Sequence, residues 1–276
     1  MPRPLKELLK GLIGERAASA VGAFDLIGDI AVIRIPEDLR EHSEIIGETL
    51  MKVNKTVKSV WAQIGPVEGD YRVRELVHIA GEKRSETIYR ENGCVFKVDV
   101  TKVFFTPRLS QERKRIAELV SNGETVFNMF AGVGTFSIVI ARKKFSTIHS
   151  SEINPYAYEY MLENIKLNKL KGNVIPYLKD AAEVAEELQG KVDRVLMPLP
   201  EKAIEYFKYA LKSLKPQGFV HVYLHISYSK GSDENEAIKR GAEQIPSGKV
   251  IYYRAVREVG PRTVQVVYDV EVNNHS

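Results

Sequence analysis

The chain has 276 residues, of which 44% are hydrophobic and 28% are charged, and its formal net charge is +4. That length accommodates one α/β domain of roughly 150 to 200 residues and a smaller second domain. The sequence contains no apolar run near the roughly 20 residues that cross a bilayer and no signal-peptide pattern, so we expect a cytoplasmic protein without a membrane anchor.

Residues 1–108 predict a small α+β domain. Apolar residues recur at helical spacing through residues 1 to about 20, which predicts an amphipathic helix. Residues 24–36 then alternate β-branched and polar positions around a Gly-Asp turn, and further strands are expected at 75–81 and 86–105. The Asn92-Gly93 pair inside the last of these segments predicts a hairpin turn.

Residues 109–276 alternate short apolar runs with helical patterns, which is typical of a parallel sheet covered on both faces. The expected strands are 125–130, 146–152, 173–178, 193–200, 219–226, 250–256 and 264–272. The expected helices are 111–122, 133–143, 155–169, 180–189, 201–214 and 233–244. No helix separates the last two strands, so they should pair antiparallel. The fold class is therefore α/β, and its seven strands with a terminal hairpin resemble the class I methyltransferase-type sheet more than a dinucleotide-binding Rossmann domain.

A glycine-rich turn follows the first strand of this second domain. Gly132 and Gly134 lie between that strand and a helix, at the edge of the sheet where open α/β folds bind their ligands. Glu152 ends the next strand, 20 residues beyond Gly132, where a carboxylate can accept hydrogen bonds from both ribose hydroxyls of an adenosine. This arrangement predicts an adenosine site.

Two cofactors contain such an adenosine. NAD is the less suitable, because Phe136 replaces the third glycine of the dinucleotide motif and no basic cluster awaits a second phosphate. We therefore favour S-adenosylmethionine. Asp180 follows the third strand, where it would meet the adenine amine, cap the next helix, or do both. The expected cofactor-binding residues here are Phe130, Ala131, Gly132, Gly134, Glu152, Ile153, Asp180, Ala181 and Pro198.

Residue types and spacings argue against disulfide and metal chemistry. Cys94 is the only cysteine, which excludes an internal disulfide and a zinc or iron–sulfur site built on cysteines of this chain alone. His221 and His225 are four residues apart, but they fall in an expected strand, where such side chains stand too far apart for easy joint ligation. We expect no metal site.

Several segments carry a specific resemblance. They are FFTPRLSQERKRI, FNMFAGVGTFSI, SEINPYAYEYMLENIKLNKL and DRVLMPLPEKAIEYF in the second domain, with FDLIGDIAVIRIP and GDYRVRELVHIAGEKRSETIYRENGCVFKVD in the first. Together they resemble the family that joins the tRNA guanine-37 N1-methyltransferases to the wyosine-pathway aminocarboxypropyltransferases. The resemblance covers nearly the whole chain. It implies an S-adenosylmethionine-dependent enzyme that modifies position 37 of tRNA, with residues 1–108 on the tRNA side.

The two branches of that family transfer different carbons from the sulfonium, and the carbon in line with the nucleophile decides the product. The methyltransferase branch carries an asparagine after its fourth strand, where this chain has Pro198-Leu199-Pro200. Its archaeal members also commonly carry an additional N-terminal module, for which the residues before 24 leave no room. Both departures favour transfer of the 3-amino-3-carboxypropyl group to C7 of 4-demethylwyosine in tRNA(Phe), by a monomer. The alternative is guanine-37 N1-methylation.

The resemblance also implies roles for individual side chains. Arg113 matches a residue that contacts the methionine carboxylate, with Ser110 assisting. Glu112 matches the general base of the methyltransferase branch, and a ring carbon that attacks must also lose a proton. Arg72 matches an arginine near the oxygen of the target base. The alternatives are a surface acid for Glu112 and a solvated or phosphate-binding arginine for Arg72.

Overall fold

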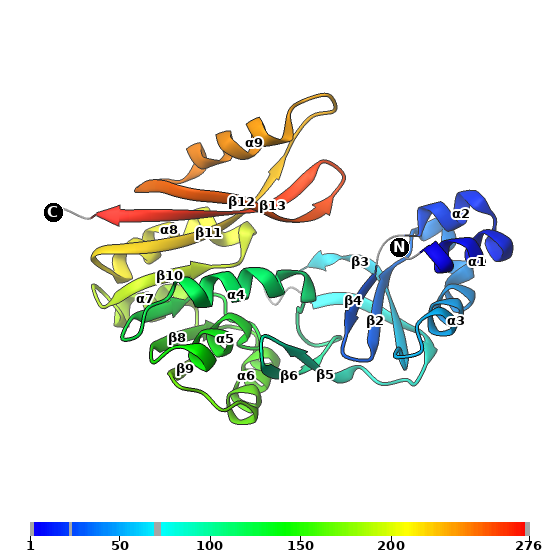
Figure 1. Ribbon diagram of the computed structural model, residues 1–276, viewed down its shortest axis with the longest axis horizontal. Helices are drawn as coiled ribbons and strands as arrows, with labels where there is room; N and C mark the ends of the chain where they lie inside the picture. Colours follow the sequence, from blue (N-terminus) through cyan, green and yellow to red (C-terminus); the bar gives the residue numbers. More distant parts are fainter. Residues whose placement is uncertain (1–2, 22–23, 69–72, 274–276) are drawn as a thin grey trace. The chain divides into compact units, whose positions relative to one another are not determined.

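The computed structural model describes residues 3–21, 24–68 and 73–273. It divides into two compact units, Met1–Glu91 with Val95–Arg108, and Asn92–Cys94 with Leu109–Ser276. Figure 1 shows the elements of both units.

The first unit combines helices with a small sheet. Its elements are α1 (Arg3–Ile13), α2 (Glu15–Ala20), β1 (Phe24–Ile27), β2 (Ile30–Arg34), the 3-10 helix η1 (Glu37–His42), α3 (Ser43–Val53), β3 (Ser59–Glu68), β4 (Val73–Gly81), β5 (Glu86–Glu91) and β6 (Cys94–Asp99). Strands β1 to β4 form one sheet in that order, and β5 and β6 form a two-stranded sheet. Strands β2 and β3 are parallel, so η1 and α3 make the crossover between them.

The core of this unit lies between the helices and one face of the four-stranded sheet. Leu5 and Leu9 of α1 are fully buried together with Ile46 of α3 and Ile33 of β2. This packing explains the helical spacing of apolar residues near the N-terminus. The single helix expected over residues 1 to about 20 is instead two helices, because Gly14 between them adopts the left-handed conformation that ends α1.

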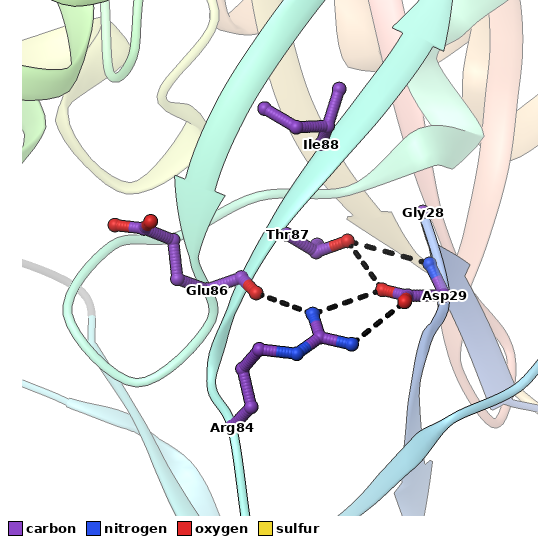
Figure 2. A pocket seen from close by; sticks show the side chains of 6 residues that line it. All are labelled: Gly28, Asp29, Arg84, Glu86, Thr87 and Ile88. Atoms are coloured by element: carbon purple, nitrogen blue, oxygen red, sulfur yellow. Dashed lines mark hydrogen bonds and ion pairs between the residues drawn. The ribbon is translucent and has the colours of Figure 1, made fainter. Parts of the chain in front are cut away.

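A charged turn joins the two hairpins of this unit (Figure 2). Asp29, in the turn between β1 and β2, accepts hydrogen bonds from Arg84 Nη2 at 2.7 Å and from Thr87 Oγ1 at 2.7 Å. These contacts hold the start of β5 against the turn. An open pocket of about 440 Å³ lies over them, lined by Gly28, Asp29, Arg84, Glu86, Thr87 and Ile88. Since Arg84 also bonds Glu82 and the carbonyl of Glu86, the charged groups of this pocket already bind one another.

The hairpin expected at Asn92-Gly93 is confirmed. Both residues have positive φ, 49° for Asn92 and 74° for Gly93, as the tight turns that favour this dipeptide require. The turn connects β5 to β6, and the Asn92 side chain donates a hydrogen bond to the Ser110 carbonyl at 3.1 Å.

The second unit alternates strands and helices. Its elements are α4 (Ser110–Leu119), β7 (Thr125–Asn128), α5 (Thr135–Lys143), β8 (Thr147–Glu152), α6 (Pro155–Leu167), β9 (Asn173–Leu178), α7 (Ala181–Glu187), β10 (Val192–Met197), α8 (Pro200–Ser213), β11 (Leu214–Ser227), α9 (Glu234–Gly241), the 3-10 helix η3 (Ala242–Gln244), β12 (Lys249–Gly260) and β13 (Thr263–Asn273). A further 3-10 helix, η2 (Pro107–Leu109), precedes α4.

The seven strands of this unit form one sheet in the order β12-β13-β11-β10-β7-β8-β9. Strands β7 to β11 run parallel, and β13 enters antiparallel between β11 and β12. The predicted α/β class, the seven-stranded sheet and its antiparallel terminal hairpin are confirmed. Because β7 lies in the middle with crossovers to both sides, the carboxyl ends of β7 and β10 flank the point where the strand order reverses.

Successive residues of each strand face opposite sides of the sheet, so the two faces carry different chemistry. One face packs on α7, α8 and α9 through an entirely apolar core that includes Phe127, Val220 and Tyr268. The other face, toward α4 and α5, carries buried polar side chains on the same strands, including Asn128 and His221. The polar face lies on the side of the helix that begins at Ser110.

The Gly28 turn generates a stability prediction. A Cβ at Gly28 would lie 2.3 Å from Thr87 Oγ1 and 2.5 Å from the Ile88 carbonyl oxygen, and φ is +58°. Gly14 also has positive φ, but a Cβ there meets nothing within 4 Å. Gly14→Ala should therefore cost about 1 kcal/mol of unfolding free energy, and Gly28→Ala about 3 kcal/mol or more. Equal losses in denaturant unfolding of the two variants would contradict the tight packing of β5 on this turn.

Candidate cofactor and active site

The glycine turn after β7 has two glycines with different constraints. Gly132 and Gly134 have φ of +56° and +88°, which favours glycine at both positions. A Cβ at Gly134 would lie 3.0 Å from Met161 Cγ, so this glycine allows α6 to pack closely. A Cβ at Gly132 would meet nothing within 4 Å, so its backbone faces open space. Gly132 therefore provides the bare backbone that a ligand can approach.

Glu152 lies beside this turn, as the sequence predicted from the ends of β7 and β8. Its carboxylate accepts hydrogen bonds from the backbone N–H of Gly132 at 2.7 Å and of Asn154 at 2.8 Å. Burial raises the pKa of Glu152, while the N–H groups of Asn154 and Gly132 act in the opposite direction. The backbone N–H of Ile153 also bonds to Glu152, and because a carboxylate has about four acceptor positions, capacity remains for a ribose hydroxyl. These residues fit an adenosine.

Asp180 does cap a helix, which was one of its two expected roles. Its Oδ1 accepts from the backbone N–H of Ala182 at 2.7 Å, at the start of α7. Its Oδ2 accepts from the hydroxyl of Tyr206 at 2.8 Å, and burial together with this carboxylate raises the pKa of Tyr206. The ring of Tyr206 meets that of Phe130 edge to face, with centroids 5.4 Å apart. Asp180 and Phe130 are thereby brought to one end of the sheet.

Apolar side chains are exposed at the same edge. Ile153, Tyr156 and Leu178 follow the ends of β8 and β9, and they are 37%, 55% and 47% exposed. Large apolar groups in this position suit the flat face of an adenine base. Ile153 was expected from the sequence, whereas Tyr156 and Leu178 were not. The signal for Leu178 was an apolar residue at the end of a parallel strand, whereas Tyr156 lies in the first turn of α6.

The remaining expected cofactor residues lie at the same sheet end or on α4. Ala131 is buried in the turn after β7, Ala181 is buried as the first residue of α7, and Pro198 is partly exposed after β10. Arg113 is buried on α4, and Ser110 begins that helix. Arg72 lies outside the described residues.

Glu112 is a buried carboxylate. It is 1% exposed, which corrects the alternative of a surface acid. Arg115, one turn later on α4, donates from Nη2 at 2.6 Å and from Nε at 3.0 Å, and the Tyr223 hydroxyl of β11 donates at 2.8 Å. Burial beside this carboxylate raises the pKa of Tyr223 well above its ordinary value. A buried carboxylate needs such partners, because an unpaired one would cost several kcal/mol.

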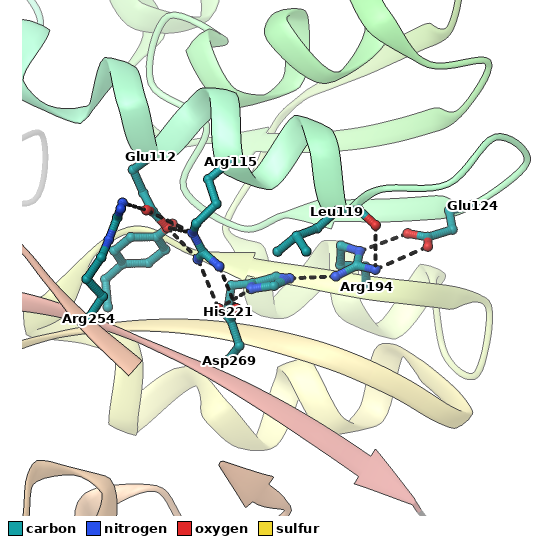
Figure 3. Close-up of polar contacts among 9 residues, drawn as sticks. Glu112, Arg115, Leu119, Glu124, Arg194, His221, Arg254 and Asp269 are labelled. Carbon is teal, nitrogen blue, oxygen red and sulfur yellow. Dashed lines mark hydrogen bonds and ion pairs between the residues drawn. The ribbon is translucent and has the colours of Figure 1, made fainter. Parts of the chain in front are cut away.

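Further polar contacts extend from Arg115 across the sheet (Figure 3). Arg115 also donates to Asp269 of β13 at 2.6 Å, and His221 of β11 contacts the other oxygen of Asp269 at 2.6 Å. Arg194 of β10 contacts His221 at 2.7 Å and donates two hydrogen bonds to Glu124, which precedes β7. Ion pairs and hydrogen bonds thus connect α4 to the three strands β13, β11 and β10.

The arginine fixes the protonation state of His221. A guanidinium only donates, so His221 Nε2 must accept from Arg194 and the ring must be neutral, with its proton on Nδ1 facing Asp269. Burial lowers the pKa of His221, in agreement with this neutral form. The carboxylate of Asp269 has a lowered pKa because His221 and Arg115 both donate to it, against the effect of burial.

This network lies close to the glycine turn. Tyr223, which donates to Glu112, contacts the ring of Phe136 edge to face with centroids 6.0 Å apart. Phe136 belongs to the first turn of α5, two residues after Gly134. One aromatic contact and one hydrogen bond therefore separate Glu112 from the helix that begins at the expected cofactor turn.

The described residues contain neither a metal-binding cluster nor a membrane-spanning helix. No group of three or more His, Cys, Asp or Glu side chains in this part of the chain is arranged to hold a metal ion. None of the helices formed by the described residues has the length and apolar character needed to span a membrane.

Two family models together match most of the chain. Residues 87–247 match the model of the TRM5/TYW2 methyltransferase domain, and residues 5–84 match that of the TYW2 N-terminal domain. The predicted family and class I methyltransferase-type fold are thus confirmed.

Three curated relatives illustrate the range of activities. The Pyrococcus abyssi tRNA (guanine(37)-N(1))-methyltransferase Trm5b is 41% identical, over 91% of this chain and 75% of its own length. The Saccharolobus solfataricus tRNA 4-demethylwyosine(37)-methyltransferase Taw21 is 38% identical, over 91% and 94%. The Methanocaldococcus jannaschii tRNA(Phe) (4-demethylwyosine(37)-C(7)) aminocarboxypropyltransferase is 35% identical, over 72% and 77%.

Two similar solved structures are complexes, one with tRNALeu and one with AdoMet. The complex of aTrm5 and tRNALeu has a TM-score of 0.84 at 35% identity, covering 99% of this chain and 79% of that one. M. jannaschii TYW2 in complex with AdoMet has a TM-score of 0.63 at 29% identity, covering 90% and 98%. The predicted cofactor, S-adenosylmethionine, is confirmed by this likeness.

Glu152 should contribute to cofactor affinity. Glu152→Gln removes a charged acceptor of ribose hydrogen bonds while keeping the shape of the side chain, so binding of S-adenosylmethionine should weaken by about 1 to 3 kcal/mol. Glu183→Gln, at an exposed acid in the first turn of α7, is the matched control and should bind as the wild type does. Unchanged affinity of the Glu152 variant in titration calorimetry would place the adenosine elsewhere.

His221 should make the second unit sensitive to acid. Its pKa is lowered from 6.5 on folding, so its contribution is fully present above pH 6.5 and is lost as the pH falls below that value. The loss should approach about 1.4 kcal/mol per pH unit. His221→Asn, which keeps one donor and one acceptor, should flatten this dependence in denaturant titrations from pH 7 to pH 5. His42→Asn, at the surface, should not. An unaltered slope in the His221 variant would contradict the neutral buried ring.

Proposed function

This chain belongs to the TRM5/TYW2 methyltransferase family of S-adenosylmethionine-dependent tRNA-modifying enzymes, and we propose that its substrate is the tricyclic base 4-demethylwyosine at position 37 of tRNA. We expect tRNA(Phe) as the acceptor and a monomer as the active form. Residues 1–108 would serve the tRNA side, and residues 109–276 hold the cofactor.

The turn after β10 is the observation that carries the choice of base. Pro198, Leu199 and Pro200 lead from β10 into α8, and Leu199 as the N-cap residue makes no side-chain hydrogen bond. This turn therefore offers no polar side chain where the N1-methylating branch has an asparagine. A ring carbon that attacks as a nucleophile has less need of such a contact than guanine N1 has. The absence favours the tricyclic base over guanine.

The group transferred is proposed to be methyl. Taw21, which is named for methylation of 4-demethylwyosine, aligns over 91% of this chain and 94% of its own length, whereas the aminocarboxypropyltransferase aligns over 72% and 77%. For this transfer the methyl carbon would have to lie in line with the attacking ring carbon of the base.

Aminocarboxypropyl transfer to C7 is the second candidate. The match of residues 5–84 to the TYW2 N-terminal domain favours it. The Pro198-Leu199-Pro200 turn is compatible with either group, because both transfers act on the same base. In either transfer the protein must remove a proton from the ring carbon after that carbon has attacked.

We propose that Glu112 accepts that proton. Its carboxylate lies on α4, the helix that also carries the two residues expected to contact the methionine carboxylate. Ser110 and Arg113 would bind the methionine end, and Arg72 would stabilise negative charge on the oxygen of the base. S-adenosylmethionine supplies the electrophilic carbon. The residues of α4 would orient the reactants and receive the proton.

The reaction is decided by its products. With tRNA that bears 4-demethylwyosine at position 37, the enzyme should release S-adenosylhomocysteine and add one methyl group to the base. Unmodified guanosine-37 tRNA should be a poor substrate, because the attacking ring carbon exists only after the third ring has been built. Mass spectrometry of the digested nucleosides and of the adenosine by-product measures both. Methylthioadenosine would establish the second candidate instead, and N1-methylguanosine in unmodified tRNA would contradict the choice of base.

A further inference from the structure

The three partners of Glu112 differ in how accessible they are. Tyr223 is fully buried, and the side chain of Arg115 is 17% exposed. Arg254 of β12 also donates to Glu112, from Nη2 at 2.8 Å, and its side chain is 44% exposed. Figure 3 shows Arg254 reaching Glu112 from the side opposite Arg115. Arg254 is therefore the partner that a ligand in solution can reach.

The two oxygens of Glu112 accept hydrogen bonds from different sets of donors. Oε1 accepts from the Tyr223 hydroxyl and from Nη2 and Nε of Arg115, at 2.8, 2.6 and 3.1 Å. Oε2 accepts from Arg115 Nε at 3.0 Å and from Arg254 Nη2 at 2.8 Å. A carboxylate oxygen accepts about two hydrogen bonds, so neither has a position left for a proton from a substrate. Departure of Arg254 alone would free Oε2 and leave Glu112 anchored by the other two.

Strand β12 covers this part of the network. It lies at the edge of the sheet, and Ile251, Tyr252 and Tyr253 are 50%, 39% and 42% exposed. The ring of Tyr252 covers Arg115, whose guanidinium carbon lies 4.8 Å from the ring centroid. Among the contacts of the described residues, Arg254 donates one hydrogen bond, to Glu112. Its other guanidinium donors are then available to an incoming anion.

We propose that Arg254 gates Glu112 by exchanging partners with the tRNA. In the free enzyme Arg254 occupies Oε2 of Glu112. When the nucleotide binds, a backbone phosphate beside the target base takes Arg254 as its partner, and Oε2 becomes the acceptor for the base. A nucleotide whose base reaches Glu112 brings its own phosphate within reach of an arginine side chain, and guanidinium binds phosphate in a paired geometry. This inference rests on the proposed function.

The chemical step needs no further reactant. The ring carbon forms a bond to the transferred carbon, the bond from that carbon to sulfur breaks, and its electron pair stays on sulfur as the thioether. The ring carbon then gives its proton to Glu112 Oε2, and the electrons of the carbon–hydrogen bond return to the ring. Glu112 becomes a neutral carboxylic acid and releases the proton to solvent after the product leaves.

Arg254→Gln tests the gate by separating binding from chemistry. Affinity should be measured for 4-demethylwyosine-37 tRNA on enzyme saturated with S-adenosylhomocysteine, and the rate as a single turnover with labelled S-adenosylmethionine at saturating tRNA. Loss of one phosphate contact should weaken tRNA binding about 3- to 10-fold and reduce the salt slope of binding by about 1. The single-turnover rate at saturating tRNA should fall far less than that of Glu112→Gln, because Arg254 has left the carboxylate before the base reacts.

A second variant measures the exchange itself. Glu112→Gln should slow the single turnover by about 100-fold or more while tRNA binds as tightly as before or more tightly. In the Glu112→Gln enzyme, Arg254 has no ion pair to break before it binds the phosphate. Arg254→Gln should therefore reduce tRNA affinity more in the Glu112→Gln enzyme than in the wild type. Arg257→Gln, on the same strand but bonded to Gln265, is the matched control for loss of one positive charge and should show no such coupling.

Three outcomes would overturn the gate. Arg254→Gln with unchanged tRNA affinity and salt slope would remove the phosphate contact. A fall in the saturated rate as large as that of Glu112→Gln would mean that Arg254 stays on the carboxylate during the reaction. Equal effects of Arg254→Gln in the two backgrounds would exclude an exchange of partners. The proposed function fails separately, if the wild-type enzyme transfers no label to this tRNA.

Discussion

A buried carboxylate between two guanidinium groups is the constraint on which the second unit depends. Glu112 is inaccessible to solvent, and Arg115, Arg254 and Tyr223 all donate hydrogen bonds to its carboxylate. Arg115 in turn requires Asp269. Loss of Glu112 would leave the largely buried Arg115 without one of its two carboxylate partners, and breaking such a buried pair costs about 3 to 5 kcal/mol. Helix α4 is thereby fixed on β11 and β13.

The same constraint connects the fold to the chemistry. Helix α4 begins at Ser110 and carries the side chains proposed to bind the methionine end of the cofactor and to deprotonate the base. Its rigid attachment holds these side chains at one place relative to the glycine turn. Tyr223 makes the link, through Glu112 on one side and Phe136 on the other. The cofactor turn is equally fixed, because Glu152 binds the backbone of Gly132. Arg254 is the exception, a half-exposed partner on an edge strand.

Local patterns predicted the parts of this structure that depend on local sequence. A strand, a glycine turn and an acid at the next strand end placed Gly132 beside Glu152, because carboxyl ends of adjacent parallel strands share an edge. The break at Gly14 and the elements α3 and β3 were missed, since short apolar segments fit helix and strand alike. The charge network was also missed. Arg115 and Asp269 are 154 residues apart, and no periodicity relates them.

The central claim is that the carboxyl edge of β7, β8 and β10 holds S-adenosylmethionine with its reactive carbon toward Glu112. A crystal structure of the chain with S-adenosylmethionine tests this most directly. The account predicts the ribose hydroxyls within hydrogen-bonding distance of Glu152, the methionine carboxylate on Arg113, and the methyl carbon on the side of Glu112. A nucleoside bound away from Gly132 and Glu152, or a sulfonium whose substituents all point away from α4, would contradict it.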